Sequence, residues 1–153
     1  MRLFKIVTFS FLALTSVVQA QISDQSTIPF STKDRWGVDQ LPTSFHASLN
    51  TDIESLNQQK HQGYKVAEFL PASISPEYLG QWTITADGDY VWRAKIQVEN
   101  AMALGFYFEQ FELVPGAYLH FYDPLKDHVI GAYTHKNNKS SRKFATEFVS
   151  GDI

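Results

Sequence analysis

From about Tyr64 onward, apolar and polar residues alternate with a period of two in short runs. The run from Tyr90 to Val98 shows the pattern most clearly. One face would carry Tyr90, Trp92, Ala94, Ile96 and Val98, and the other Arg93, Lys95 and Gln97. Because successive side chains of a strand point to opposite faces, this pattern predicts a half-buried strand, and we assign Trp92 to the core.

Turn residues separate this run from others of the same kind. Asp87-Gly88 predicts a hairpin that pairs Gln81 to Thr85 with the strand starting at Tyr90. Further strands are expected around Leu104 to Phe108, Ala117 to Tyr122, His128 to Tyr133 and Phe144 to Val149, with turns at Pro115-Gly116 and Asp123-Pro124. About six short strands at such spacing are typical of an all-β fold, an antiparallel jelly-roll-like β-sandwich over residues 66–153.

The last four residues, Ser150 to Ile153, have the pattern of a turn followed by the first residue of another strand. We therefore expect the sandwich to lack its last strand in this chain and the chain to be a fragment. A missing strand would leave an open sheet edge, which natural proteins usually cover.

The region 21–65 is polar and weakly patterned, and we interpret it as a linker with one short helix. Thr51-Asp52-Ile53-Glu54 has the pattern of a capping box, where a helix begins. Ile53 and Leu56 supply only a thin apolar stripe, too little for the helix to fold alone. Pro42 and the surrounding Ser, Thr and Gln residues favour a linker or a segment draped over another part of the molecule.

Residues 1–20 have the pattern of a signal peptide. Arg2 and Lys5 precede an apolar run from Ile6 to Val18, and Val18-Gln19-Ala20 fits the small-residue rule for cleavage. The run is shorter than the roughly 20 residues of a membrane-spanning helix. We expect a mature chain that begins at Gln21, is secreted or lies in the periplasm or at the cell surface, and has no membrane contact after cleavage.

Composition excludes disulfide bonds and limits the kinds of partner that we expect. The chain has no cysteine, so an exported form would be held by its core or by surrounding polypeptide. Removing Arg2 and Lys5 would lower the formal net charge from −3 to −5. Such a mildly acidic chain gives no reason to expect nucleic acid as a partner.

The residues needed for catalysis or for binding a metal do not occur in a recognisable spacing. No serine lies in a Gly-x-Ser-x-Gly elbow, and Gly151-Asp152 is followed by Ile153. His120 and His128 could approach each other across the Asp123-Pro124 turn, but no His-x-His or His-Glu-x-x-His spacing is present. Carboxylate pairs for glycoside hydrolysis could be drawn from Asp87, Asp89, Glu109 and Glu112, but the choice is arbitrary. We expect no catalytic residues, no metal site and no cofactor.

Two surface features are candidates for binding. The loop from Thr134 to Lys143 has four cations and no acid, and it is our candidate partner-contact loop: Lys136, Lys139, Arg142 and Lys143. The simpler explanation, which the composition favours, is a solvated loop kept soluble by its lysines. Tyrosines could form a platform for a sugar ring, with Tyr107, Tyr118, Tyr122 and Tyr133 as candidates, although a sandwich core also needs large aromatic residues.

The ordered string of motifs resembles one known domain. It runs through Gly80-x-Trp82, Asp87-Gly88, Val91-Trp92-Arg93-x-x-Ile96, Ala103 to Phe108, Phe111-x-Leu113-x-Pro115-Gly116-Ala117-x-Leu119-x-x-Tyr122, Val129-x-Gly131-Ala132-Tyr133-Thr134, Asn137-Asn138-Lys139 and Phe144-Ala145-Thr146-Glu147-x-Val149-x-Gly151-Asp152. This string is similar to the N-terminal β-domain of secreted bacterial lysyl-endopeptidase-like, trypsin-like serine peptidases. The resemblance covers about Leu70 to Asp152, with Ser150 at a position where the family tends to have proline.

The resemblance implies a prodomain or accessory role. In that family a further strand and the peptidase domain follow this point, so the catalytic His, Asp and Ser would lie beyond Ile153. It implies a non-catalytic N-terminal region whose partner is the cognate peptidase domain, in cis or in trans. The alternative that the residues leave open is a free-standing exported β-sandwich that binds carbohydrate or a cell-surface partner.

Overall fold

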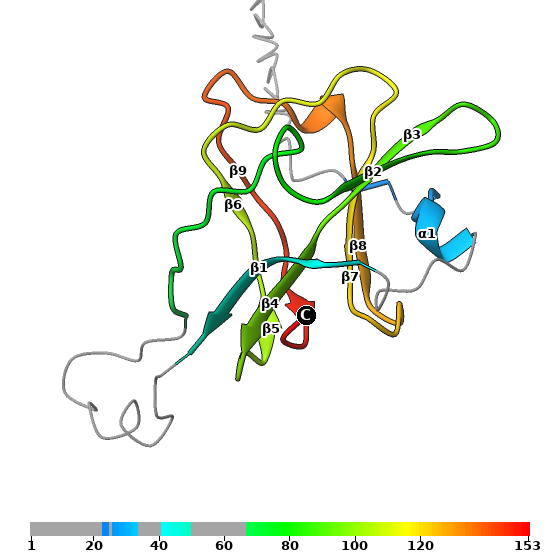
Figure 1. Ribbon diagram of the computed structural model, residues 1–153. Helices are drawn as coiled ribbons and strands as arrows, with labels where there is room; N and C mark the ends of the chain where they lie inside the picture. Colours follow the sequence, from blue (N-terminus) through cyan, green and yellow to red (C-terminus); the bar gives the residue numbers. More distant parts are fainter. Residues whose placement is uncertain (1–22, 25, 34–40, 50–66) are drawn as a thin grey trace, which may run out of the picture.

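The computed structural model describes residues 23–24, 26–33, 41–49 and 67–153, and this part of the chain is all-β apart from two short helices. The predicted signal peptide and the capping box at Thr51 lie outside the described residues. The helices are α1 (Phe30–Lys33) and the 3₁₀ helix η1 (His135–Asn137). The strands are β1 (Thr43–Ser48), β2 (Gln81–Ile84), β3 (Tyr90–Arg93), β4 (Lys95–Glu99), β5 (Ala103–Leu104), β6 (Tyr107–Phe108), β7 (Leu119–Tyr122), β8 (Val129–Tyr133), β9 (Phe144–Ala145) and β10 (Val149–Ser150). Figure 1 shows their arrangement.

The two hairpins predicted from turn residues are confirmed. β2 pairs antiparallel with β3, and the Thr85 N–H donates to the Asp89 carbonyl at 2.9 Å at the start of the turn. β7 pairs antiparallel with β8, and the Asp123 carboxylate accepts a hydrogen bond from the His128 N–H at 3.0 Å. Such side-chain-to-backbone bonds are the reason that Asp starts turns so often.

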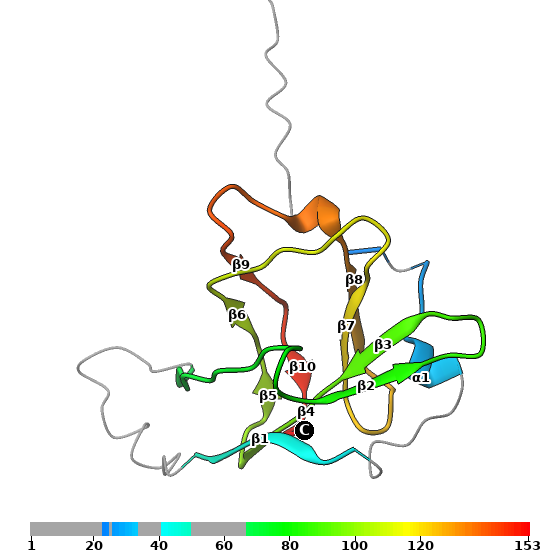
Figure 2. The same ribbon diagram turned by 45° about the horizontal axis from the view of Figure 1, so that its top comes forward.

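The prediction of a linker over 21–65 is wrong for residues 43–48, because β1 lies within it. β1 pairs with β4 in parallel, with Ala47 opposite Val98. This pair also corrects the expectation of a purely antiparallel sheet. The first two views show β1 lying alongside β4 (Figures 1 and 2). Residues 43–48 therefore belong to the β-domain, and its boundary at 66 has to move towards the N-terminus.

Residues 23–24 and 26–33 also pack on the β-domain, along the β7–β8 hairpin. Asp24 and Ala132 exchange both backbone hydrogen bonds at 3.0 Å. The Ser31 hydroxyl donates to the Tyr122 hydroxyl at 2.6 Å, and the Lys126 ammonium donates to the Ser31 carbonyl at 2.8 Å. Of the two interpretations given for this region, the segment draped over another part of the molecule describes residues 23–24 and 26–33.

Three predicted strands are each divided, and the one from Leu104 to Phe108 forms β5 and β6. The run from Tyr90 to Val98 breaks at Ala94 into β3 and β4, and these two strands pair with different partners, β2 and β1. The predicted strand from Phe144 to Val149 consists of β9, which pairs with β6, and β10, which pairs with β5. A change of partner requires the backbone to change direction, which a continuous alternation of side chains does not reveal.

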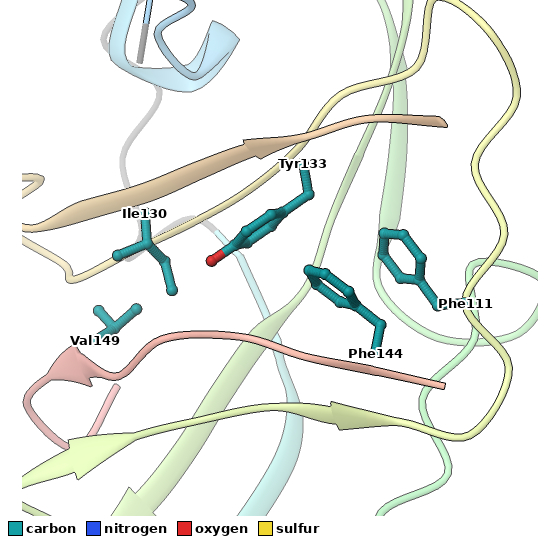
Figure 3. Packing of buried hydrophobic residues seen from close by; sticks show 5 residues of the cluster. All are labelled: Phe111, Ile130, Tyr133, Phe144 and Val149. Atoms are coloured by element: carbon teal, nitrogen blue, oxygen red, sulfur yellow. The ribbon is translucent and has the colours of Figure 1, made fainter. Parts of the chain in front are cut away.

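The core gathers around β8 and the C-terminal segment. Figure 3 shows Ile130 and Tyr133 of β8 facing Val149 and Phe144, with Phe111 beside Phe144. The rings of Phe111 and Phe144 are stacked with centroids 4.3 Å apart, and Tyr133 meets Phe144 edge-on at 4.9 Å. Trp92, assigned to the core from its pattern, is only partly buried and lies outside this cluster.

The C-terminal segment continues along two strands in turn. β10 pairs antiparallel with β5, and the Gly151 N–H donates to the Met102 carbonyl at 2.8 Å. The Asp152 carbonyl then accepts a hydrogen bond from the Val98 N–H of β4 at 2.8 Å. Because the N–H and C=O groups of successive strand residues point to opposite edges, this bond lies on the edge of β4 away from β1.

Candidate interaction surface

The β2–β3 hairpin carries a face of large apolar side chains. Its register places Trp82 opposite Trp92 and Ile84 opposite Tyr90, so the four side chains share one face, here called the hairpin face. Trp82, Ile84 and Tyr90 are 54%, 62% and 72% exposed. The sequence predicted that the side of this strand bearing Tyr90 would face the core, and that prediction is wrong for Tyr90.

The opposite face of the hairpin is the less exposed one. Thr83 and Val91, which lie opposite each other, are both partly buried, and so is Arg93. The hairpin projects from the right-hand side of the domain in both views (Figures 1 and 2). The smaller and more polar side chains thus lie toward the domain, while two aromatic rings and an isoleucine face solvent.

Hydrogen bonds hold both indole rings of the hairpin face in place. The Trp82 indole N–H donates to the Pro76 carbonyl at 2.8 Å, and the Trp92 indole N–H donates to the Leu79 carbonyl at 2.7 Å. Gly80 permits this close approach, since a Cβ there would lie 2.5 Å from the Arg93 carbonyl oxygen and 2.6 Å from the Trp92 indole nitrogen. The two rings are therefore positioned before any partner binds, which lowers the entropy cost of binding.

Acidic residues lie next to the hairpin face. Asp87 and Asp89 are in the exposed turn that joins β2 and β3, and Glu77 is in the loop that anchors the two indoles. Asp89 contributes its backbone N–H to the turn, which donates to the Thr85 hydroxyl at 3.0 Å. The surface therefore combines an apolar centre with negative charge at its margin.

The four cations of the predicted partner-contact loop are all exposed. Lys136 lies in η1, and the other three lie in the stretch between η1 and β9, which is at the top of both views (Figures 1 and 2). The structure corrects their expected local charge of +4, because Glu112 approaches from another segment and pairs with Arg142 at 3.1 Å. The positive charge of Lys136 contributes to a lowered pKa of Asp24, after the hydrogen bonds from Ser26. The other two cations of this loop, Lys139 and Lys143, are exposed side chains.

The two hairpin histidines contact different segments. The His120 Nε2 lies 3.3 Å from both the hydroxyl and the carbonyl oxygen of Thr27, and burial lowers the pKa of His120. The His128 Nδ1 accepts a hydrogen bond from the Ser150 N–H at 3.1 Å. Within the ranges that the structure describes, no group of three or more His, Cys, Asp or Glu side chains could hold a metal ion.

His128 also makes a contact that resembles part of a nucleophilic site. Its Nδ1 lies 3.1 Å from the Ser150 hydroxyl oxygen. Because the Ser150 backbone N–H donates to the same nitrogen, the neutral ring carries its proton on Nε2. Among the described residues no carboxylate contacts the ring, and the Asp123 carboxylate accepts from the His128 backbone instead. The pair therefore has a hydroxyl and a base but not the orienting acid of a triad.

The other predicted site residues are separated or serve structural roles. Asp87 and Asp89 belong to the β2–β3 turn, whereas Glu109 and Glu112 follow β6 on another part of the domain (Figure 1). Of the four tyrosines proposed as a sugar platform, Tyr133 is in the core and Tyr122 is partly buried against Ser31, while Tyr107 and Tyr118 are exposed. The structure thus does not bring these four rings together as one platform.

A shallow pocket of about 350 Å³ lies beside Tyr118. It is formed by three segments that are distant in sequence: Ser23 and Asp24, residues 116–118, and Ala132 with Thr134 to Lys136. Its lining combines one aromatic ring with a carboxylate, an imidazole, an ammonium and two hydroxyl groups. Such a mixture suits a small polar ligand better than an apolar one.

Comparison with known proteins finds no family model and no solved structure that matches the chain. No helix within the described ranges is long and apolar enough to cross a membrane.

Proposed function

We propose that this chain is the non-catalytic N-terminal region, a prodomain or accessory module, of a secreted lysyl-endopeptidase-like, trypsin-like serine peptidase. Its β-domain would act on the cognate peptidase domain as a folding aid, an inhibitor or a substrate-side module. The proposal extends to the finer fold, a jelly-roll-like β-sandwich, and to export directed by residues 1–20.

The observation that carries the proposal is that the motif string coincides with positions where the backbone geometry demands a particular residue. At Gly80 any side chain would collide with Arg93 and Trp92. At Gly131 a Cβ would lie 2.5 Å from the Leu119 carbonyl oxygen, with φ at +102°. Trp82 and Trp92, also in the string, are the residues whose indoles are anchored. A string that includes such constrained positions supports kinship more strongly than a shared composition does.

The C-terminal hydrogen bonds favour a further strand in the complete domain. The Asp152 carbonyl pairs with Val98 on the edge of β4 that faces away from β1, and β4 pairs with no other strand of the described part. Polypeptide continuing in the same direction would run antiparallel to β4 towards Ile96, the next residue whose backbone groups point to this edge. A strand added there would cover an otherwise open edge.

The coding sequence beyond codon 153 tests this proposal directly. We expect an open reading frame that supplies a further strand and then a peptidase domain with a Gly-Asp-Ser-Gly-Gly signature. A stop codon at that point, in a gene that is expressed, would contradict the proposal.

The proposed lack of catalysis is tested on the purified chain. It should not hydrolyse lysyl or arginyl esters above the blank rate. Turnover that survives repurification and disappears in Ser150→Ala or His128→Ala would assign catalysis to the one Ser–His contact described above, and the proposal would fail.

One observation favours a second candidate function. The pocket beside Tyr118 combines an aromatic ring with polar groups, as a site for a sugar ring would. In that case the chain would be a free-standing exported β-sandwich that binds carbohydrate or a cell-surface partner. Binding of a defined oligosaccharide that is lost in Tyr118→Ala, together with a stop after codon 153, would support this candidate.

A further inference from the structure

We propose that the hairpin face is the docking surface for the peptidase domain, which would offer an apolar patch bordered by lysine or arginine. This inference rests on the proposed function, since the partner is the domain that the proposal assigns to the same precursor. It names the surface that makes the contact and the chemistry that would recognise it.

The first argument is the orientation of the hairpin. Burying Trp82, Ile84 and Tyr90 would remove more apolar surface from water than burying Thr83 and Val91, yet the hairpin presents the first set to solvent. Exposed apolar patches that run against the hydrophobic effect in this way mark interaction sites. A partner that covers the hairpin face restores the burial that the domain itself does not provide.

The second argument is size. A fully buried aromatic side chain removes about 150–250 Å² from water, so the exposed parts of Trp82 and Tyr90 present roughly 200–300 Å², and Ile84 raises the total to roughly 300–400 Å². That is about half of the roughly 800 Å² that each partner contributes to a standard interface. The hairpin face therefore has the size of an interface centre, and the surrounding turn and loop would form its rim.

The third argument is charge. Asp87 and Asp89 in the turn and Glu77 in the anchoring loop place negative charge at this rim. Charges at a rim speed the encounter with a complementary partner and exclude partners of like charge. The occupant that fits is consequently a protein surface with an apolar centre and a basic margin. A neutral polysaccharide could donate hydrogen bonds to the carboxylates, but it would gain no long-range charge attraction from them.

The test measures by calorimetry the affinity of the 153-residue chain for the separately produced peptidase domain. The variant Ile84→Ser/Tyr90→Ser removes the two most exposed apolar groups of the hairpin face. Met102→Ser/Leu125→Ser is the matched control, since both residues are exposed and lie elsewhere. We expect the hairpin variant to bind about tenfold to hundredfold more weakly and the control to stay within about twofold of the original chain.

A second set of variants tests the charged rim of the hairpin face separately from its apolar centre. Asp87→Lys/Asp89→Lys should weaken binding several-fold at low salt, and the difference should shrink as salt is raised because screening shortens the reach of exposed charges. Glu109→Lys/Asp127→Lys changes the same number of exposed carboxylates away from the hairpin and should have little effect. Circular dichroism of each variant, with the single variant Tyr90→Ser as a milder substitution, confirms that the fold is kept.

The outcomes distinguish the two levels of the proposal. If the original chain does not bind the peptidase domain at all, the proposed function fails and this inference fails with it. If it binds and Ile84→Ser/Tyr90→Ser binds equally well, the docking surface lies elsewhere while the proposed function stands. If the same variant loses binding to an insoluble polysaccharide but keeps binding to the peptidase domain, the hairpin face is a carbohydrate platform, and the inference is overturned.

Discussion

Two aromatic groups of this domain have similar side chains and opposite environments. Phe111, Tyr133 and Phe144 come from three segments and pack into one buried cluster. Trp82 and Tyr90 lie on neighbouring strands of one local hairpin and face solvent. Both groups arise from alternating sequence. The comparison teaches that alternation indicates which side of a strand is apolar, whereas burial depends on whether another segment covers that side.

The largest expected effect comes from the buried cluster. Phe144→Ala removes a ring that is 2% exposed and contacts Phe111, Phe108 and Tyr133. We expect a loss of about 3–5 kcal/mol in the free energy of unfolding, a large share of a small domain's stability. Urea denaturation followed by circular dichroism measures it. Phe148→Ala, an exposed phenylalanine of the same segment, is the control and should cost less than about 1 kcal/mol.

Trp92 tests the boundary between the two groups. Because it is partly buried and its indole donates to the Leu79 carbonyl, Trp92→Ala should cost about 2–3 kcal/mol, less than Phe144→Ala. Trp92→Phe keeps much of the packing and should lose about 1 kcal/mol through the missing hydrogen bond. A loss for Trp92→Ala that exceeds the loss for Phe144→Ala would return Trp92 to the core, as its sequence pattern predicted.

His120 of β7 contacts Thr27 of the N-terminal segment, and we expect this contact to be sensitive to pH. Burial lowers the pKa of His120 below its ordinary value of 6.5, so the folded state favours the neutral ring. The unfolded chain then binds a proton first as pH falls, and stability is lost from about pH 6.5 down through the folded-state pKa. Thermal unfolding between pH 8 and pH 5 should show a smaller decrease for His120→Gln than for the original chain. An identical pH dependence would contradict the assignment.

The smallest effect is expected on the hairpin face. Ile84→Ser/Tyr90→Ser should change the stability of the isolated chain by no more than about 0.5 kcal/mol per residue, because both side chains already lie in water. The same denaturation experiment measures it. A loss close to that of Phe144→Ala would mean that this face is covered in solution, by self-association or by another segment. Sedimentation would tell these two cases apart.

Local sequence chemistry predicted the turns but not the surface that they display. Asp87-Gly88 and Asp123-Pro124 marked the two hairpins, because their backbone preferences act within a few residues. The hairpin face escaped the prediction, since Tyr90 and Trp92 alternate just as core residues do. Only the register of Trp82 with Trp92 and Ile84 with Tyr90, which follows from the predicted turn, could have indicated that four large side chains share one face.

Long-range contacts account for the other differences. β1 was interpreted as a linker because its partner β4 is about fifty residues away and pairs with it in parallel, which no local signal reveals. The charge of the basic loop was overestimated because Glu112, which pairs with Arg142, is thirty positions earlier in the chain. In both cases the two partners are far apart in the sequence and become neighbours only in the folded chain.

The sequence by itself determined that the chain from about Tyr64 onward is all-β and where its tight turns fall. These properties depend on backbone sterics and on side-chain bonds within a few residues. The tertiary structure alone decided which apolar faces are buried, which strands pair across long distances, and which charges find partners. Those choices depend on three-dimensional packing, where Phe144 meets Phe111 and Tyr133 while Trp82 and Tyr90 meet water.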